Sequence, residues 1–149
     1  MKTKVLMVCL GNICRSPLAE GILKYKADPA RVEVDSAGTA GYHVGNPPDP
    51  RSVAIAKKYQ IDISSQRCRK FRREDFDFFD HIFVMDRDNY RDVCALAQNE
   101  TQKGKVRLLL EVSDSDLVEV PDPYYGGSDG FELVFRLIDQ ACDQLVKEL

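Results

Sequence analysis

The stretch Lys4-Val5-Leu6-Met7-Val8-Cys9-Leu10-Gly11-Asn12-Ile13-Cys14-Arg15-Ser16-Pro17 joins an apolar strand to a helix through a short loop. Cys9 lies six positions before Arg15, so five residues separate a thiol from a guanidinium. Backbone N–H groups of such a loop can surround one tetrahedral anion, and Ser16-Pro17 predicts the N-cap and first residue of the helix. The stretch therefore predicts a phosphate-binding loop directly after the first strand.

The residues inside this loop suit a tight anion cradle. Gly11 and Asn12 are the residue types that best tolerate left-handed backbone conformations. The first helical turn has no acidic residue before Glu20, so the positive end of the helix dipole is left for a ligand. That dipole, the loop N–H groups and Arg15 all favour the thiolate form of Cys9. The alternative is that Cys9 simply ends a buried strand. The loop is not of the Walker type, because the Gly-Lys-Ser/Thr ending of that loop is absent.

Length and composition bound the class of protein. The chain of 149 residues suits a single domain over residues 1–149 with a real core. With 21 Lys plus Arg and 24 Asp plus Glu, the net charge of -3 gives no reason to expect a nucleic-acid partner. The apolar run after Lys4 is too short for a signal peptide or a transmembrane helix, so we expect no membrane partner. Five irregularly spaced cysteines and two histidines favour a reducing cytoplasm and no metal site.

Strands alternate with helices along the chain. We expect strands over residues 4–9, 32–34, 81–85 and 106–110, and helices over about 17–27, from a cap at Asp49 to about Tyr59, after a cap at Asp86, and at the C-terminal end. The helix after Asp86 has an apolar face of Tyr90, Val93, Cys94 and Ala97, and that of the last helix consists of Phe131, Val134, Phe135, Ile138, Cys142 and Leu145. This alternation predicts an α/β fold with a parallel sheet, whose ligands bind at the C-terminal ends of the strands.

A second motif, Asp122-Pro123-Tyr124-Tyr125-Gly126-Gly127, supplies a candidate proton donor. A thiolate under a bound phosphoryl group can attack phosphorus to give a phosphocysteine while Arg15 holds two oxygens, and no metal is needed. The leaving oxygen then needs a proton, which Asp122 between its two prolines can donate. Tyr124 and Tyr125 can wall a slot for a flat aromatic group. The alternatives are a plain surface turn and tyrosines that anchor the loop in the core.

Five segments carry a family pattern: Val8 to Pro17, Asp35-Ser36-Ala37-Gly38-Thr39, Pro48-Asp49-Pro50-Arg51, Met85-Asp86 with Asn89, and Asp122-Pro123-Tyr124. Together they resemble the low-molecular-weight protein tyrosine phosphatases over nearly the whole chain, and the segment from Ala37 to Pro50 resembles bacterial members. The resemblance implies a four-stranded parallel sheet flanked by helices on both faces, and hydrolysis of phosphotyrosine and small aryl phosphates. It also implies that Cys9 is the nucleophile, that Arg15 clamps phosphate, that Asp122 is the general acid and base, and that the loop residues Leu10, Gly11, Asn12, Ile13 and Cys14 bind phosphate with Arg15.

The same resemblance implies supporting roles within the loop. Ser16 would steady the Cys9 thiolate, although N-capping alone is the alternative for this residue. Asn12, in a strained conformation, would hold the loop open through side-chain hydrogen bonds. Cys14 would form a disulfide with Cys9 under oxidation and so protect it from over-oxidation, or it is an inert buried thiol.

Four further positions are interpreted beside this pattern. Tyr42 stands where the mammalian members of the family carry a bulky aromatic residue at the cleft rim, and we interpret it as a substrate wall. His43 beside it is interpreted as solvated and without a role. Gln66 stands in place of a histidine that hydrogen-bonds the loop in mammalian members, so support of the loop is expected to differ. Asp86 resembles a family aspartate near the loop, and we interpret it as a helix cap.

Other charged residues and cysteines receive no catalytic role. A basic run lies within seven positions and consists of Arg67, Arg69, Lys70, Arg72 and Arg73. Such a run predicts a solvated face, with a binding surface for an acidic partner as the alternative. The family resemblance implies that this run lies away from the catalytic loop. Cys94 and Cys142 are expected in the core, and Cys68 has no partner pattern.

Three other functions compete for the same loop. Arsenate reduction on this fold needs a close cysteine pair on a mobile segment, whereas Cys68 and Cys94 are 26 positions apart. Phosphoarginine phosphatases tend to carry Thr where this chain has Ile13. A non-catalytic phosphate-binding module would need neither Cys9 nor Asp122. We therefore expect a monomeric cytoplasmic enzyme without a cofactor, which acts on tyrosine-phosphorylated proteins and releases inorganic phosphate.

Overall fold

The fold is built on a four-stranded parallel sheet with the strand order β2-β1-β3-β4. The computed structural model describes residues 2–124 and 128–149. The strands are β1 (Thr3–Cys9), β2 (Val32–Gly38), β3 (His81–Val84) and β4 (Val106–Leu108). The apolar run from Val5 to Val8 in β1 is fully buried, as expected for an interior strand that is covered on both faces.

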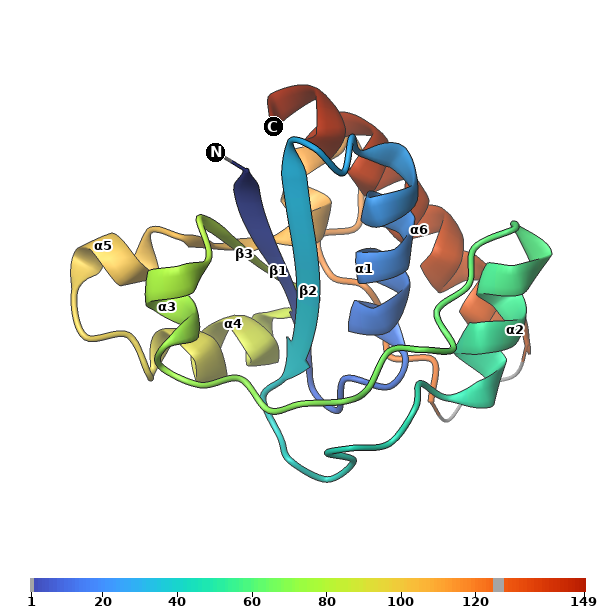
Figure 1. The fold of residues 1–149 in the computed structure, drawn as a ribbon, viewed down its shortest axis with the longest axis horizontal. Helices are drawn as coiled ribbons and strands as arrows, with labels where there is room; N and C mark the ends of the chain where they lie inside the picture. Colours follow the sequence, from blue (N-terminus) through green and yellow to red (C-terminus); the bar gives the residue numbers. More distant parts are fainter. Residues whose placement is uncertain (1, 125–127) are drawn as a thin grey trace.

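Helices cover both faces of the sheet, which confirms the predicted α/β class (Figure 1). On one face lie α1 (Arg15–Lys26), α2 (Pro50–Lys58) and α6 (Ser128–Glu148), and on the other side lie α3 (Asp75–Phe78), α4 (Arg87–Cys94) and α5 (Glu100–Lys103). The core accordingly forms two clusters, one between the sheet and α1 with α6, the other between the sheet and α3 with α4. The six apolar residues predicted on one face of the last helix are all buried.

The carboxyl ends of the strands gather the loops that follow them. Cys9 pairs with Gly38 across β1 and β2, and Val8 pairs with Val84 across β1 and β3. Beyond the paired residues, the Thr39 N–H donates to the Cys9 carbonyl at 2.9 Å. Because β1 is central, the loop that starts at Leu10 is flanked by the loops that follow both neighbouring strands.

Several element boundaries differ from the expectation. β2 extends to Gly38, because its last residues pair with β1 up to Cys9. β4 ends at Leu108 and a 3-10 turn, η1 (Leu109–Val112), replaces the rest of the predicted strand. The helix after Asp86 ends at Cys94, so Ala97 packs beyond it, and the short helices α3 and α5 were not expected.

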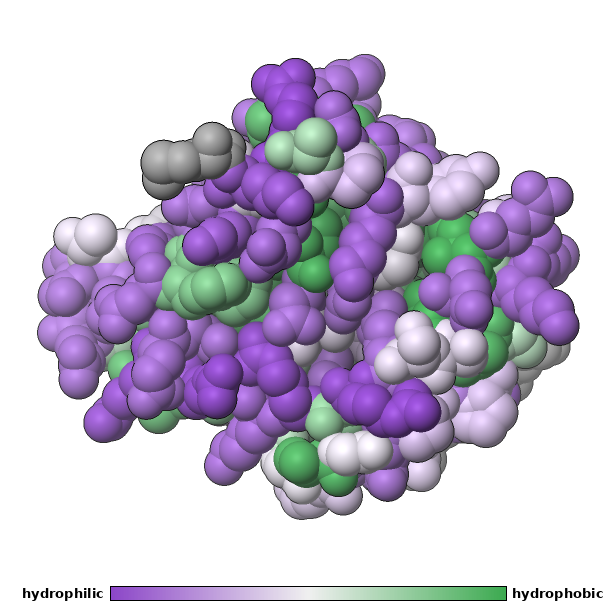
Figure 2. Space-filling view, in the orientation of Figure 1, coloured by the Kyte–Doolittle hydropathy of each residue, from purple (hydrophilic) through white to green (hydrophobic). Residues whose placement is uncertain are grey.

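The described surface contains no element for crossing a membrane and no metal cluster. None of the helices in residues 2–124 and 128–149 combines the length and apolar character of a membrane span. The same residues contain no group of three or more potential metal ligands. The face in Figure 2 is mostly hydrophilic, with hydrophobic atoms in small separate patches.

The contact between Gly38 and the phosphate loop leads to the first prediction. A Cβ atom at Gly38 would lie 2.8 Å from the Leu10 carbonyl oxygen and 3.1 Å from the Asn12 nitrogen. These are backbone atoms, so Gly38→Ala has to displace the loop itself. We expect a destabilisation of about 1–3 kcal/mol in urea unfolding and a clear loss of phosphate affinity.

Gly41→Ala is the matched control, because its new Cβ would lie 3.6 Å from Lys70 Cδ, an ordinary contact with a flexible side chain. It should leave both properties unchanged. Equal phosphate affinity in the two variants would contradict the proposed close fit at Gly38.

Candidate active site

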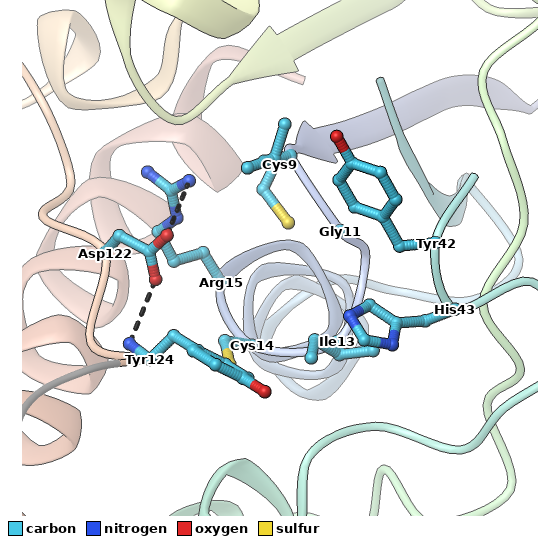
Figure 3. A pocket seen from close by; sticks show the side chains of 10 residues that line it. Cys9, Gly11, Ile13, Cys14, Arg15, Tyr42, His43, Asp122 and Tyr124 are labelled. Carbon is cyan, nitrogen blue, oxygen red and sulfur yellow. Dashed lines mark hydrogen bonds and ion pairs between the residues drawn. The ribbon is translucent and has the colours of Figure 1, made fainter. Parts of the chain in front are cut away.

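A cleft of about 290 Å³ opens at the carboxyl end of β1 (Figure 3). It contains most of the predicted site residues, although they come from three distant parts of the chain. The lining residues are Cys9, Leu10, Gly11, Ile13, Cys14, Arg15, Tyr42, His43, Asp122 and Tyr124. Tyr125, the remaining predicted wall residue, lies outside the described residues.

The loop after Cys9 has the unpaired donors that an anion needs. The Asn12 N–H donates to Cys9 Sγ at 3.3 Å. In the described parts of the chain, no protein acceptor takes the backbone N–H groups of the other loop residues, Leu10, Gly11, Ile13, Cys14 and Arg15. The start of α1 adds the positive end of its helix dipole, and no acidic residue in the first turn compensates it. Unpaired N–H groups at a helix N-terminus bind an oxyanion such as phosphate.

The backbone of Asn12 adopts a left-handed conformation, with φ of 57°. This matches the strained conformation implied by the family resemblance. Gly11, which also tolerates that region, does not adopt it in this loop. The Gly11 position is constrained by space instead, since a Cβ there would lie 3.2 Å from His43 Cδ2.

The side chain of Asn12 is the centre of a directed hydrogen-bond network. Its Oδ1 accepts from the Arg69 backbone N–H at 3.0 Å, so its Nδ2 is the donor to Ser16 Oγ at 2.8 Å and to Ser36 Oγ at 3.0 Å. The Ser36 hydroxyl in turn donates a hydrogen bond to Glu20 Oε1 at 2.6 Å. The network therefore ends on the buried Glu20 carboxylate, which also pairs with Lys24.

This direction determines what Ser16 does. Its oxygen accepts from Asn12, and it lies 3.0 Å from Cys9 Sγ. The Ser16 hydroxyl also lies 3.4 Å from the Ala37 carbonyl, but an ionised Cys9 sulfur at 3.0 Å is the nearer and the charged acceptor for its proton. The predicted N-cap at Ser16 is wrong, because α1 starts at Arg15 with Cys14 as N-cap and without a side-chain cap.

The basic segment contacts the loop, contrary to the expectation that it lies away from it. The Arg69 backbone N–H donates to Asn12 Oδ1, and Cys68 Sγ–H donates to the Asn12 carbonyl at 2.8 Å. The Arg69 guanidinium pairs with Asp35 and Asp75 instead of facing solvent alone. The cause is tertiary: this segment bridges to Gly38 at the end of β2 through Lys70.

Gln66 supports the helix that follows the loop. Its Nε2 donates to the Pro17 carbonyl at 3.1 Å, in the first turn of α1. This contact is made to the helix, one residue beyond Ser16, and whether support of the loop differs from that in mammalian members stays a prediction.

Arg15 is held along one edge and presents the other to the cleft. Its Nη1 donates to Asp86 Oδ2 at 2.7 Å and to the Val120 carbonyl at 2.9 Å. Burial alone would lower the pKa of Arg15, but the nearby Cys9 charge and the Asp86 hydrogen bond outweigh it and raise this pKa. Asp86 also caps α4 through the Asn89 N–H at 2.8 Å. The interpretation of Asp86 as a cap alone is therefore wrong, because it also positions Arg15.

Asp122 faces Arg15 across the mouth of the cleft. Its Oδ1 accepts the Tyr124 N–H at 3.0 Å, while Oδ2 lies 3.9 Å from Arg15 Nη2. Because Oδ1 is occupied by a donor, a proton on this carboxyl belongs on Oδ2, which points into the cleft (Figure 3). The Asp122 side chain is 42% exposed, so its carboxyl is in contact with solvent.

Aromatic rings stand on two sides of the cleft. Tyr42 is 77% exposed on one rim, and Tyr124 forms the other side near Asp122. His43 packs edge-on to Tyr42 at 6.4 Å between ring centroids and lies over Gly11. Sequence reasoning gave His43 no role, since only the tertiary fold brings its segment back to the loop.

Cys14, the second loop thiol, remains neutral. Burial, together with the charges of Asp49, Cys9 and Asp122, raises its pKa to about 12. It is a free thiol, as is every cysteine of the chain. The cleft thus combines one sulfur that receives hydrogen bonds with a second, protonated sulfur.

Comparison with known proteins agrees with this geometry. The family model described as low molecular weight phosphotyrosine protein phosphatase matches residues 4–149. The chain belongs to this family. The predicted fold and the predicted enzyme class are thereby confirmed.

Relatives of this family match over almost their full length. A Drosophila melanogaster low molecular weight phosphotyrosine protein phosphatase is 42% identical and covers 99% of this chain and 97% of its own. A Bacillus subtilis low molecular weight protein-tyrosine-phosphatase is 41% identical, covering 97% and 94%. The crystal structure of a protein tyrosine phosphatase from Entamoeba histolytica has a TM-score of 0.94 at 37% identity, covering 99% of this chain and 96% of that one.

Proposed function

We propose that this family member is a single-domain enzyme over residues 1–149 that hydrolyses phosphotyrosine, and small aryl phosphates, through a phosphocysteine on Cys9. The observation that carries the proposal is the set of unpaired loop N–H groups above the N-terminus of α1, with Cys9 Sγ among them. Arg15 adds a charged fork for two phosphate oxygens. A phosphoryl group bound there lies directly over the sulfur.

In the first step Cys9 Sγ attacks phosphorus and the bond to the tyrosine oxygen breaks. The loop N–H groups and Arg15 stabilise the charge on the three equatorial oxygens. Asp122 Oδ2 donates its proton to the leaving phenol oxygen. In the second step the Asp122 carboxylate takes a proton from water as that water attacks phosphorus, which restores the thiolate and releases inorganic phosphate.

The walls of the cleft support an aromatic substrate. Tyr42 and Tyr124 line the cleft and offer their rings to a flat phenyl group, and Ile13 adds an apolar side chain to the lining. We therefore propose tyrosine-phosphorylated proteins as substrates of a cytoplasmic, monomeric enzyme without a metal or cofactor. The loop amides and Arg15 supply the positive charge that a metal would otherwise bring.

Cys9→Ser tests the nucleophile. A serine hydroxyl is a far weaker nucleophile than a thiolate, so kcat for p-nitrophenyl phosphate should fall by at least about 10³-fold while phosphate still binds. Steady-state kinetics and a phosphate-binding titration measure the two effects. Cys142→Ser, at a buried thiol in α6, is the matched control. Substantial turnover in Cys9→Ser would rule out the mechanism.

Asp122→Asn tests the proton donor. Asparagine keeps the acceptor for the Tyr124 N–H but has no proton to give. We expect kcat/KM to fall by about 10²-fold or more for phenyl phosphate, and much less for p-nitrophenyl phosphate, whose leaving group needs little protonation. The measurement is a leaving-group series of aryl phosphates. An equal loss along the whole series would exclude Asp122 as the acid.

We further propose that Cys14 protects Cys9 during oxidation. Peroxide converts the Cys9 thiolate to a sulfenic acid with release of hydroxide. Cys14 loses its proton to solvent, its thiolate attacks the Cys9 sulfur, and the disulfide forms as the sulfenic S–O bond breaks and the oxygen leaves as hydroxide, which takes up a proton from solvent. The attacking species is the Cys14 thiolate, which the raised pKa keeps scarce at neutral pH.

The redox proposal predicts a pH dependence. The pKa of Cys14 is about 12, so its thiolate fraction, and the rate of disulfide closure, should rise about tenfold per pH unit over the range below that value. Mass spectrometry after a peroxide pulse at several pH values measures this. Cys14→Ser should yield sulfinic Cys9 instead, whereas Cys142→Ser should behave as wild type. Sulfinic Cys9 as the sole product in wild type at every pH would refute the proposal.

A further inference from the structure

We propose that Arg51 is a positioning residue that holds the Asp122–Tyr124 segment at a fixed place relative to the phosphate loop. This inference rests on the proposed function, in which Asp122 is the acid. Arg51 itself does not line the cleft. It would act through Tyr124 and Asp122, and would thereby connect the phosphate loop with the segment that carries the proposed acid.

The first turn of α2 is attached to the phosphate loop from behind. The Asp49 N–H donates to the Ile13 carbonyl at 2.8 Å, and Ser52 Oγ, which is fully buried, contacts the Cys14 carbonyl at 3.3 Å. These contacts use the outward-facing carbonyls of the loop. The position of α2 is therefore defined by the loop backbone.

Asp49 in turn fixes Arg51 in one orientation. Its carboxylate accepts Arg51 Nε at 3.0 Å on Oδ1 and Nη2 at 3.0 Å on Oδ2, and Oδ1 also accepts the Arg51 backbone N–H at 2.8 Å. The hydrogen bonds from Arg51 hold the pKa of Asp49 below its usual value, so the pair stays ionised. A bidentate fork of this kind defines the plane of the guanidinium as well as its position.

The guanidinium lies against the ring of Tyr124, which lines the cleft, and against the ring of Phe131 in α6. Its central carbon is 4.7 Å from the Phe131 ring centroid and 5.4 Å from that of Tyr124. Phe131 is almost fully buried in α6, which makes it a fixed support. Arg51 therefore couples Tyr124 to α2 and α6 through cation–π contacts.

The link continues from Tyr124 to the acid. The Tyr124 N–H holds Asp122 Oδ1, and Pro123 between them packs near Gly130 in α6. The chain of contacts thus runs from the Ile13 carbonyl through Asp49, Arg51 and Tyr124 to Asp122. It fixes the distance between the loop that binds phosphate and the Oδ2 that carries the proton.

The test is the leaving-group series with Arg51→Ala and Arg51→Lys. We expect Arg51→Ala to lower kcat/KM for phenyl phosphate about tenfold, and that for p-nitrophenyl phosphate less than about twofold, because only the proton transfer loses its geometry. Lysine keeps the charge but has neither the fork nor the flat surface, so it should restore little. Arg136→Ala removes another ion-paired, exposed arginine from α6 and should leave the whole series unchanged.

A double variant decides whether Arg51 acts through the acid. In the Asp122→Asn background, Arg51→Ala should cause no additional loss, since there is no proton to position. Multiplicative losses, or an equal loss for every leaving group in both Arg51 variants, would overturn the inference. If Asp122→Asn itself shows no leaving-group dependence, the proposed acid fails instead. Urea unfolding of each variant separates these effects from a loss of fold, and Arg51→Lys provides the test if Arg51→Ala does not fold.

Discussion

The carboxamide of Asn12 holds the phosphate loop open, and the catalytic end of the molecule depends on it. A left-handed asparagine costs about 1–2 kcal/mol relative to ordinary backbone. Three hydrogen bonds to the side chain offset this cost, and their partners come from β2, α1 and the segment after α2. Each bond is buried or half-buried, where a lost partner is expensive. The loop therefore keeps one conformation, because three separate parts of the fold hold the Asn12 side chain in place.

The charges of the cleft are arranged by burial. Arg15 is buried and paired with Asp86, so it is a fixed cation, whereas the Asp122 carboxyl is partly exposed to solvent. Cys14 is kept neutral by burial and by neighbouring negative charge, so only one sulfur competes for the donors of the loop. The cleft thus places a buried cation, a partly exposed carboxyl and a neutral second thiol around Cys9.

Prediction from the sequence succeeded where neighbouring residues determine the structure. The strand before Cys9, the caps at Asp49 and Asp86, and the apolar face of the last helix were all read from local patterns. It failed where distant segments meet. The contacts of Cys68 and Arg69 with Asn12, the second role of Asp86 and the packing of His43 over Gly11 depend on crossover connections that no local pattern encodes.

The sequence by itself determined the chemistry: a thiol, five loop residues and an arginine between a strand and a helix, with an acid far along the chain. Spacing and residue type suffice there, because the loop N–H groups and the helix dipole are properties of contiguous backbone. The tertiary structure alone decided how Asp122 reaches Arg15 and which groups hold the loop. Those distances arise from parallel strands that bring separate loops to one edge of the sheet. They also depend on α2, which is bonded to the phosphate loop, and on α6, which packs near the Asp122–Tyr124 segment.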